Sequence, residues 1–409
     1  MNLPPLNYKR IGLIVLFIAI TLGVGFLLYS FFFKSTPAPV PTPTPTENNT
    51  GELPQAGEGT AVTPGSGSGE LPGQETLPLP GGSESAGGGQ STPAAPALAE
   101  AAASISAADN GKVDFYSKTD NRFYTVGTDG KLASLSDKRF YGVEKVTWSP
   151  VGNKAVLEYP DGSNIRYDFD RQNQVTLPKH WENFEFSPAG DKLVAKSVGL
   201  DPDNRWLVVA NEDGSQAQQV QEMGENADKF IASWSPNGQS IALFVDGIDG
   251  ERKEVYFVGQ NGENFKSTVV EGRGFQPLWS PDGKQLVYSI YSSDSDYKPS
   301  LWIVGGQGDS IGSGRRPLEV TTWAQKCTYA TSGLYCAVPR SLDRGAGMFN
   351  MNNFTTQDTL YRIDPVSGLR QAIPLDSTYS MTNLSLSPDG SYLYFVDSAS
   401  GQLRQVKVR

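Results

Sequence analysis

The stretch "WSPDGKQLVYS", residues 279–289, decides the fold, because the chain repeats it with small changes. In its tetrapeptide 280–283, Ser stands first, Pro second and Gly fourth, which is what a type I turn accepts. Gly283 can take the left-handed conformation that closes a short hairpin. After the turn, Leu286 and Tyr288 lie on one face of an alternating pattern that is typical of a strand. The stretch therefore predicts a β-hairpin.

The same pattern returns along the chain at intervals that indicate a repeat protein. The clear copies are "WSPVGNKAVLEY" from Trp148, "FSPAGDKLVAKS" from Phe186, "WSPNGQSIALFV" from Trp234 and "LSPDGSYLYFVD" from Leu386. A degraded copy surrounds Gly333 and a weaker one surrounds Gly111, and successive turn glycines are 38 to 57 residues apart. Units of about 40–50 residues with four strands each are typical of a β-propeller.

We therefore expect an all-β fold over residues 104–409, a β-propeller with seven blades, six blades being the alternative. The Trp and Phe residues before the turns should pack between blades, because one four-stranded unit cannot bury both of its faces alone. The last unit looks one strand short, and a segment near residues 98–106 is expected to complete it, although that segment is rich in Ala. An irregular β-sandwich with coincidental turns is the competing interpretation.

Residues 11–33, "IGLIVLFIAITLGVGFLLYSFFF", form an uncharged and mostly apolar run. As a helix it would be about 35 Å long, which is enough to cross a hydrocarbon core of about 30 Å. Lys9 and Arg10 precede it, so the positive-inside rule leaves residues 1–10 in the cytoplasm. We expect a transmembrane signal-anchor helix, and hence a single-pass cell membrane protein with an extracytoplasmic propeller. A cleaved signal peptide and a buried core helix are the alternatives.

Residues 35–98 are rich in Pro, Gly, Ser and Thr and are predicted to be a disordered linker, because they offer too little apolar surface to offset the entropy of ordering. As a coil they would span about 45 Å. Residues 35–109 contain eight acids and no Lys or Arg, and the domain that follows carries 31 basic and 36 acidic side chains. Without a basic block, nucleic acid is a poor candidate partner.

The repeat "WSPDGKQLVYS" followed by "LWIVGGQGD" resembles that of TolB-type, WD40-like bacterial β-propellers, over roughly residues 104–409. The resemblance is specific for architecture, and it implies a binding or scaffolding module. The expected anchor and linker are features that TolB lacks, so we do not expect this chain to share TolB's partner. The arrangement is more similar to an uncharacterised group of membrane-anchored bacterial propellers.

In a propeller, the loops between the second and third strands and the joins between blades share one face, opposite the S-P-x-G turns. On that face the chain has long segments at 199–206, 246–254, 291–299 and 339–358. Because Trp, Tyr and Arg dominate binding energies, we take the aromatic and Arg residues there as the predicted binding face. They are Trp181, Arg205, Trp206, Arg273, Phe275, Tyr297, Trp323, Arg340 and Arg344. Packing between blades or binding of loop carbonyls is the alternative for each.

Cys327 and Cys336 are equidistant from the centre of the predicted hairpin in the degraded repeat. Directly opposed strand positions bring Cβ atoms about 4.5–5.5 Å apart, so a modest adjustment permits a disulfide. An exported domain lies where such a bond persists. A reduced, buried pair is the alternative, and no His or Cys lies near enough in sequence to suggest a metal site.

His180 is the only histidine, which argues against zinc chemistry and Ser-His-Asp catalysis. We therefore predict no catalytic residue, metal or cofactor. The expected function is binding or scaffolding of a protein or cell-envelope polymer. A glycoside hydrolase or lyase that uses carboxylates in the central funnel is one alternative, and a structural assembly factor without a discrete ligand is another. The sequence leaves the oligomeric state and the partner's identity open.

Overall fold

The computed structural model describes residues 23, 84–85, 95–107, 112–330 and 333–408. The chain divides into two units, Met1–Thr76 and Leu77–Arg409, and every described strand belongs to the second. Apart from Gly23, the predicted transmembrane segment 11–33 lies outside the described residues, as does the turn at Gly111. Within the described ranges, no helix combines the length and the apolar character needed to cross a membrane.

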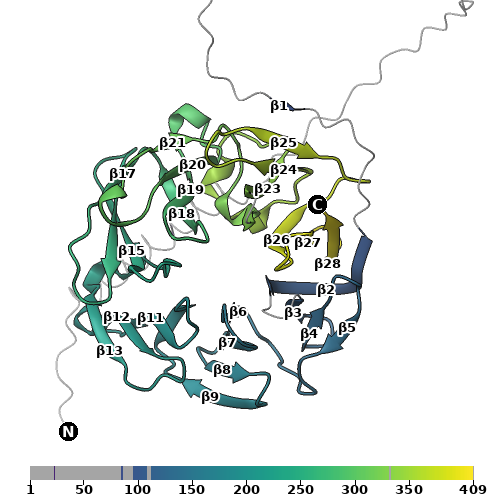
Figure 1. The fold of residues 1–409 in the computed structure, drawn as a ribbon. Coiled ribbons are helices and arrows are strands. Elements are labelled where there is room, and N and C mark those ends of the chain that lie inside the picture. Colours follow the sequence, from purple (N-terminus) through teal and green to yellow (C-terminus); the bar gives the residue numbers. More distant parts are fainter. Residues whose placement is uncertain (1–22, 24–83, 86–94, 108–111, 331–332, 409) are drawn as a thin grey trace, which may run out of the picture. The chain divides into compact units, whose positions relative to one another are not determined.

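The second unit is an all-β propeller of seven blades (Figure 1). Each blade is a four-stranded antiparallel sheet whose strands are named here from the inside of the ring outward. Blades 1 to 3 are made of β2 (Ala95–Ala107), β3 (Val113–Ser117), β4 (Arg122–Val126) and β5 (Leu132–Ser134); β6 (Lys145–Trp148), β7 (Lys154–Glu158), β8 (Asn164–Asp168) and β9 (Asn173–Leu177); and β10 (Trp181–Phe186), β11 (Lys192–Val198), β12 (Arg205–Asn211) and β13 (Gln218–Glu222).

The remaining blades follow the same order. They are β14 (Phe230–Ala232), β15 (Ser240–Gly247), β16 (Lys253–Gly259) and β17 (Thr268–Val270); β18 (Arg273–Trp279), β19 (Gln285–Tyr291), β20 (Ser300–Gly305) and β21 (Arg316–Pro317); β22 (Cys327–Ala330), β23 (Gly333–Pro339), β24 (Asp358–Ile363) and β25 (Arg370–Ile373); and β26 (Met381–Leu386), β27 (Tyr392–Asp397) and β28 (Gln402–Lys407). The short β1 (Glu84–Ser85) pairs in parallel with β25.

Short 3-10 helices occupy the connections between strands. They are η1 (Pro202–Asn204), η2 (Gly224–Lys229), η3 (Ser293–Ser295), η4 (Gly308–Ser310), η5 (Ala324–Lys326), η6 (Ala346–Met348) and η7 (Met351–Asn353).

One strand, β2, closes the ring by serving two blades. Its first part pairs with β28 through Ala95 and Ala101, and thereby supplies the missing outer strand of blade 7. Its second part, from Ala102, pairs with β3 as the inner strand of blade 1. The seven-stranded sheet β26-β27-β28-β2-β3-β4-β5 therefore contains two blades, and Figure 1 shows the C-terminal strands beside β2. The predicted completion of the last unit is confirmed, and β2 begins at Ala95, inside the range predicted as linker.

The S-P-x-G turns have the predicted geometry. Gly283 N donates to Ser280 O at 2.8 Å, and Gly283 has a φ of +66°. The same bond joins Gly390 N to Ser387 O at 2.7 Å. The serine hydroxyl adds a second closure, because Gln285 N donates to Ser280 Oγ at 2.9 Å. These turns fix the register of the first two strands in blades 2, 3, 4, 5 and 7.

Seven apolar clusters lie between neighbouring blades, one at each interface of the ring. In β19, Leu286 and Tyr288 pack toward blade 4, whereas Val287 packs toward blade 6. The alternation of the sequence therefore sorts side chains between two cores, and not between core and solvent. The anchor residues also bridge blades, since Trp148 Nε1 in blade 2 donates to Ser104 O in blade 1 at 2.8 Å.

The inner strands of blades 1, 3, 5 and 7 each carry a bulge that the sequence analysis did not predict. Its first residue has a positive φ, as at Asn183 (+54°), Gly274 (+65°) and Asn383 (+50°). An extra residue of this kind bends the strand and changes which side chains face the centre of the ring. In blade 3 the bulge turns Glu185 toward the central cavity described below.

Candidate functional site

The two faces of the ring differ in their loops. The S-P-x-G turns and the connections between third and fourth strands end on one face, called here the turn face. The opposite face, called here the long-loop face, carries the loops 199–204, 248–252, 292–299 and 340–357 and the join 135–144 between blades 1 and 2. The four loops belong to blades 3 to 6, and the join connects blades 1 and 2.

Three of the nine predicted binding residues are buried, Trp181 and Phe275 between blades and Trp323 under the 340–357 loop. Trp181 packs against Phe184 with ring centroids 6.4 Å apart, and Phe275 packs against Tyr288 at 5.3 Å. Trp323 is only 2% exposed and stacks near Phe354 at 5.5 Å. These side chains fill cores in this structure, and packing was the alternative interpretation for each of them.

Four others are half-buried and hold the loops of the long-loop face in place. Arg205 Nε donates to Gly199 O at 3.0 Å, and Trp206 Nε1 donates to Asp203 O at 3.2 Å. Arg273 Nη2 donates to Glu251 Oε1 at 2.9 Å. The carbonyl of Tyr297 accepts a hydrogen bond from Gly347 N at 2.8 Å. These contacts hold the loops of the long-loop face in their positions.

Arg340 and Arg344 are the two exposed members of the predicted set, and both belong to the 340–357 loop of blade 6. Of the nine residues, three are buried in cores, four hold loops in place and two are exposed on the surface. They do not lie together at one site. Contact of any of them with a ligand stays a prediction.

The apolar side chains that do reach solvent on the long-loop face are ones that sequence reasoning missed. They are Tyr141, Leu200, Ile248, Met348 and Phe349. Each lies in a loop or blade join without regular alternation, so periodicity gave no signal for it. Their position inside the long segments was the only available hint. On the turn face, Val151, Val366 and Leu369 are exposed in the same way.

The 340–357 loop folds as a small layer with a core of its own. Trp323, Ala346 and Met351 are buried together under the loop, with Leu342 and Phe354 packed against them. The loop is tied to its neighbour in blade 5, because Gly345 N donates to Asp296 O at 2.9 Å. Trp323 therefore packs directly under the largest loop of the long-loop face.

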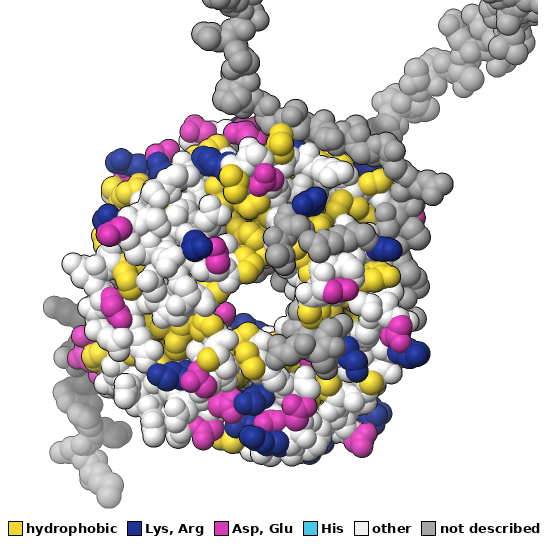
Figure 2. Space-filling view, viewed as in Figure 1, with side chains coloured by type: hydrophobic (Ala, Val, Ile, Leu, Met, Phe, Trp, Pro, Cys, Tyr) yellow, Lys and Arg dark blue, Asp and Glu magenta, His cyan; other side chains and the backbone are white. Residues whose placement is uncertain are grey.

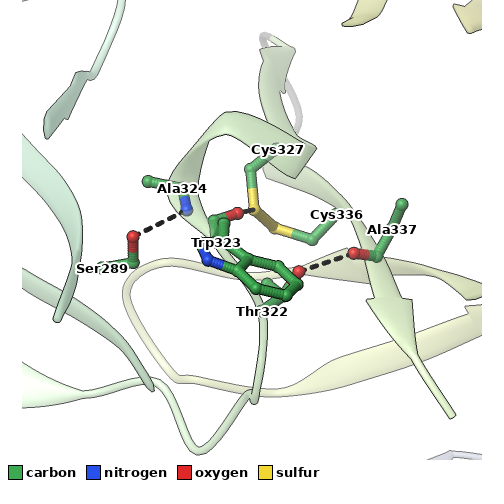
Figure 3. The surroundings of a disulfide bond; sticks show 7 residues. All are labelled: Ser289, Thr322, Trp323, Ala324, Cys327, Cys336 and Ala337. Atoms are coloured by element: carbon green, nitrogen blue, oxygen red, sulfur yellow. Dashed lines mark hydrogen bonds between the residues drawn. A yellow bond between two sulfur atoms is a disulfide. The ribbon is translucent and has the colours of Figure 1, made fainter. Parts of the chain in front are cut away.

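A disulfide joins Cys327 and Cys336 directly beside Trp323 (Figure 3). The two residues are direct partners in the β22–β23 register, which is the pairing that the sequence predicted. Thr322 Oγ1 donates to Ala337 O at 2.7 Å, and Ala324 N donates to Ser289 Oγ at 3.0 Å. Together these bonds fix the blade 5 to blade 6 connection.

A buried ion pair fixes the other end of the same loop. Lys326 Nζ lies 2.7 Å from Asp358 Oδ2 and donates to Thr356 Oγ1 at 2.7 Å. Asp358 Oδ2 also accepts a hydrogen bond from Met381 N of blade 7 at 2.7 Å. Burial lowers the pKa of Lys326, and the charge of Asp358 opposes that shift. Such a hydrogen-bonded pair ties two blades together, since leaving either partner alone is strongly unfavourable.

A cleft of about 690 Å³ lies between blades 5 and 6 and opens beside the 340–357 loop. Lys298 and Arg340 line it from the 292–299 and 340–357 loops. Arg370 lines it from the outer strand β25, and Glu319 lines it from the join that follows β21. Arg340 Nε donates to Thr359 Oγ1 at 3.4 Å. Only Arg340 among these belonged to the predicted set, because the contributions of separate blades are not adjacent in sequence.

A second cavity, of about 590 Å³, belongs to the centre of the ring, where Figure 2 shows an opening. Inner strands of blades 1 to 4 line it, and its charged groups include Lys145, Glu185 and Asp228. Burial raises the pKa of Glu185 from 4.5 to about 7, although the charge of Lys145 opposes the shift. The surface that Glu185 retains faces this cavity. In the described part of the chain, no cluster of His, Cys, Asp or Glu has the makings of a metal site.

The fold defines the class of the protein as a β-propeller, and solved structures agree. A chain of the mitotic checkpoint complex is similar with a TM-score of 0.50 at 12% identity, over 81% of this chain and 97% of that one. The β-propeller domain of Cps50 from Myceliophteria thermophila gives 0.50 at 12%, over 75% and 97%. The tricorn protease gives 0.49 at 14%, over 78% of this chain, which spans only 34% of that protein.

The two likenesses with a TM-score of 0.50 show the fold alone. No protein-family model matches the chain, and no curated protein does. The narrower resemblance to TolB-type propellers therefore rests on the repeat motif and stays a prediction.

Proposed function

We propose that the chain is a membrane-tethered, extracytoplasmic propeller that binds a protein or polymer of the cell envelope through its long-loop face. One observation carries the proposal. The long loops of several blades gather on one face and expose apolar side chains there, among them Leu200, Ile248 and Phe349. Exposed apolar groups on rigidly supported loops are typical of recognition surfaces. The apolar run 11–33 supports the tether.

The loops are suited to recognition because their bases are fixed. Trp323 and Met351 are buried under the 340–357 loop, and Arg273 binds Glu251 under the 248–252 loop. A partner would therefore meet a largely preformed surface, which lowers the entropy lost on binding.

The test replaces Leu200, Ile248 and Phe349 together by Ser in the full chain and measures capture of envelope components by mass spectrometry. The matched control replaces Val151, Val366 and Leu369 by Ser on the turn face. We expect the first variant to lose its partners and the control to keep them, with both retaining the wild-type melting temperature. Equal capture by the two variants would show that the long-loop face is not the binding surface.

A second candidate function is favoured by Glu185. A carboxyl with a pKa of about 7 in a central cavity, with Asp228 in the same lining, suits a general acid in glycoside hydrolysis or elimination. Incubating the protein with envelope polysaccharides would distinguish it from a binding module. Turnover that Glu185→Gln abolishes would establish the enzyme, whereas binding without turnover would favour the first proposal.

A further inference from the structure

Among the residues that the structure describes, two cations in the cleft between blades 5 and 6 have no acidic partner. Lys298 and Arg340 line the cleft, and neither has a carboxylate within ion-pair distance in the described part of the chain. Arg273 on the same face, by contrast, is paired with Glu251 at 2.9 Å. The charges of Lys298 and Arg340 are therefore available to a ligand.

The balance of charge in the cleft is opposite to that of the domain. Arg370 adds a third cation to the lining, with its Nη1 donating to Glu319 O, and Glu319 is the only carboxylate among the lining residues described. The chain as a whole carries a net charge of −10. A positive cleft on an acidic protein attracts anions selectively to that point.

The uncharged part of the lining indicates what carries the anion. Thr321, Ser341 and Thr359 offer hydroxyls, and Tyr361 offers a half-buried aromatic side chain. Val320, Val338, Pro339 and Leu342 make up the apolar part of the lining. A volume of about 690 Å³ lies within the usual range of small-ligand sites, about 300–1,000 Å³. An apolar ligand would desolvate the cations without pairing them, so a polar, hydroxyl-rich ligand fits better.

We propose that this cleft binds an oxyanion, a carboxylate or a phosphate, that is carried on a hydroxyl-rich chain such as an acidic glycan. Arg340 supplies the fork-shaped donor that binds oxyanions through two parallel bonds, and Lys298 supplies a compact positive charge. The inference rests on the proposed envelope-binding function and names the chemistry of one ligand.

The experiment titrates the full chain by calorimetry with three oligomers of equal length: a uronic acid oligomer, a glycerol phosphate oligomer and an uncharged sugar oligomer. The variant is Lys298→Ala with Arg340→Ala, and the control is Arg139→Ala, an exposed arginine on the 135–144 join of the same face, outside the cleft. We expect at least one anionic oligomer to bind, with a Kd that rises tenfold or more, about one decade per 1.4 kcal/mol, in the double variant only. The preferred oligomer identifies the oxyanion.

Three results would overturn the inference: equal affinity for the uncharged oligomer, unchanged affinity in the double variant, or no binding of either anionic oligomer up to about 1 mM, the weak end of the affinity scale. The envelope capture described above depends on Leu200, Ile248 and Phe349, which lie outside the cleft lining. Failure of the cleft and failure of the long-loop face are therefore measured separately.

Discussion

At the scale of single residues, the turn glycines differ in how much they tolerate. Gly238 and Gly283 both have a positive φ, +76° and +66°, which disfavours any side chain. A Cβ added at Gly283 would lie 2.7 Å from the backbone nitrogen of Asn237, whereas a Cβ at Gly238 would meet nothing within 4 Å. The turn at Gly283 therefore packs on the preceding turn, and the turn at Gly238 is open to solvent on that side.

This difference predicts a ranked pair of variants. We expect Gly238→Ala to lower the free energy of unfolding by about 1 kcal/mol through its φ alone. Gly283→Ala should cost clearly more, because the backbone of Asn237 must also move. Urea denaturation of the two variants measures the order, and an equal loss would show that the two turns do not pack as described.

Glu185 gives a prediction for pH. Its pKa is about 7 in the fold and near 4.5 when unfolded, so the unfolded state releases its proton first as the pH rises. The stability that Glu185 contributes is full below about pH 4.5 and is lost as the pH rises through about 7, by about 3 kcal/mol. Glu185→Gln should remove that part of the pH dependence in urea denaturation between pH 4.5 and 7.5.

Asp114 is the natural control for that experiment. Burial raises the pKa of Asp114 to about 6, so Asp114 also makes the protein less stable as the pH rises. The Glu185→Gln variant should keep this smaller pH dependence. A Glu185→Gln profile identical to that of the wild type would mean that the carboxyl is solvated in the central cavity.

At the scale of elements, the sequence predicted what depends on local turn chemistry. The S-P-x-G hairpins and the opposed positions of Cys327 and Cys336 follow from residue spacing alone, and both are confirmed. The bulge at Asn183 was not predicted, because a single residue with positive φ inside a strand leaves the apolar alternation nearly intact. Asn and Gly tolerate that conformation, and this was the only signal available.

The strand β2 was harder to predict for a different reason. Its sequence "APALAEAAASISA" has little of the β-branched and aromatic character of strands. Two exposed edges, of β28 and β3, impose the strand conformation on it. The candidate site was less predictable still, because burial decides which aromatic side chains reach solvent. Trp181 and Trp323 have the right chemistry but fill cores.

The disulfide between strands β22 and β23 gives a prediction about stability. Replacing Cys327 and Cys336 together by Ser opens a loop of about ten residues, which should cost about 2–3 kcal/mol of unfolding free energy through the entropy of the unfolded chain. The loss should appear in the oxidised protein, and a reducing agent should give the wild type the same stability as the variant. A variant as stable as the oxidised wild type would contradict this.

At the scale of the whole molecule, stability depends on closing the ring. We expect a fragment that begins at residue 102 to melt about 10 °C or more below one that begins at residue 95, because it lacks the strand that pairs with β28. It should also aggregate, since β28 becomes an open edge. Equal melting temperatures in calorimetry would show that blade 7 is complete without residues 95–101.

We predict that the long-loop face meets an envelope partner outside the cell, and site-specific photo-cross-linking in intact cells is the most direct test. A photoreactive residue would replace Phe349 on the long-loop face or Val366 on the turn face, both of which are exposed. We predict adducts with an envelope protein or polymer from position 349 and none from position 366. Adducts from position 366 alone, or adducts from position 349 with cytosolic proteins only, would contradict the account.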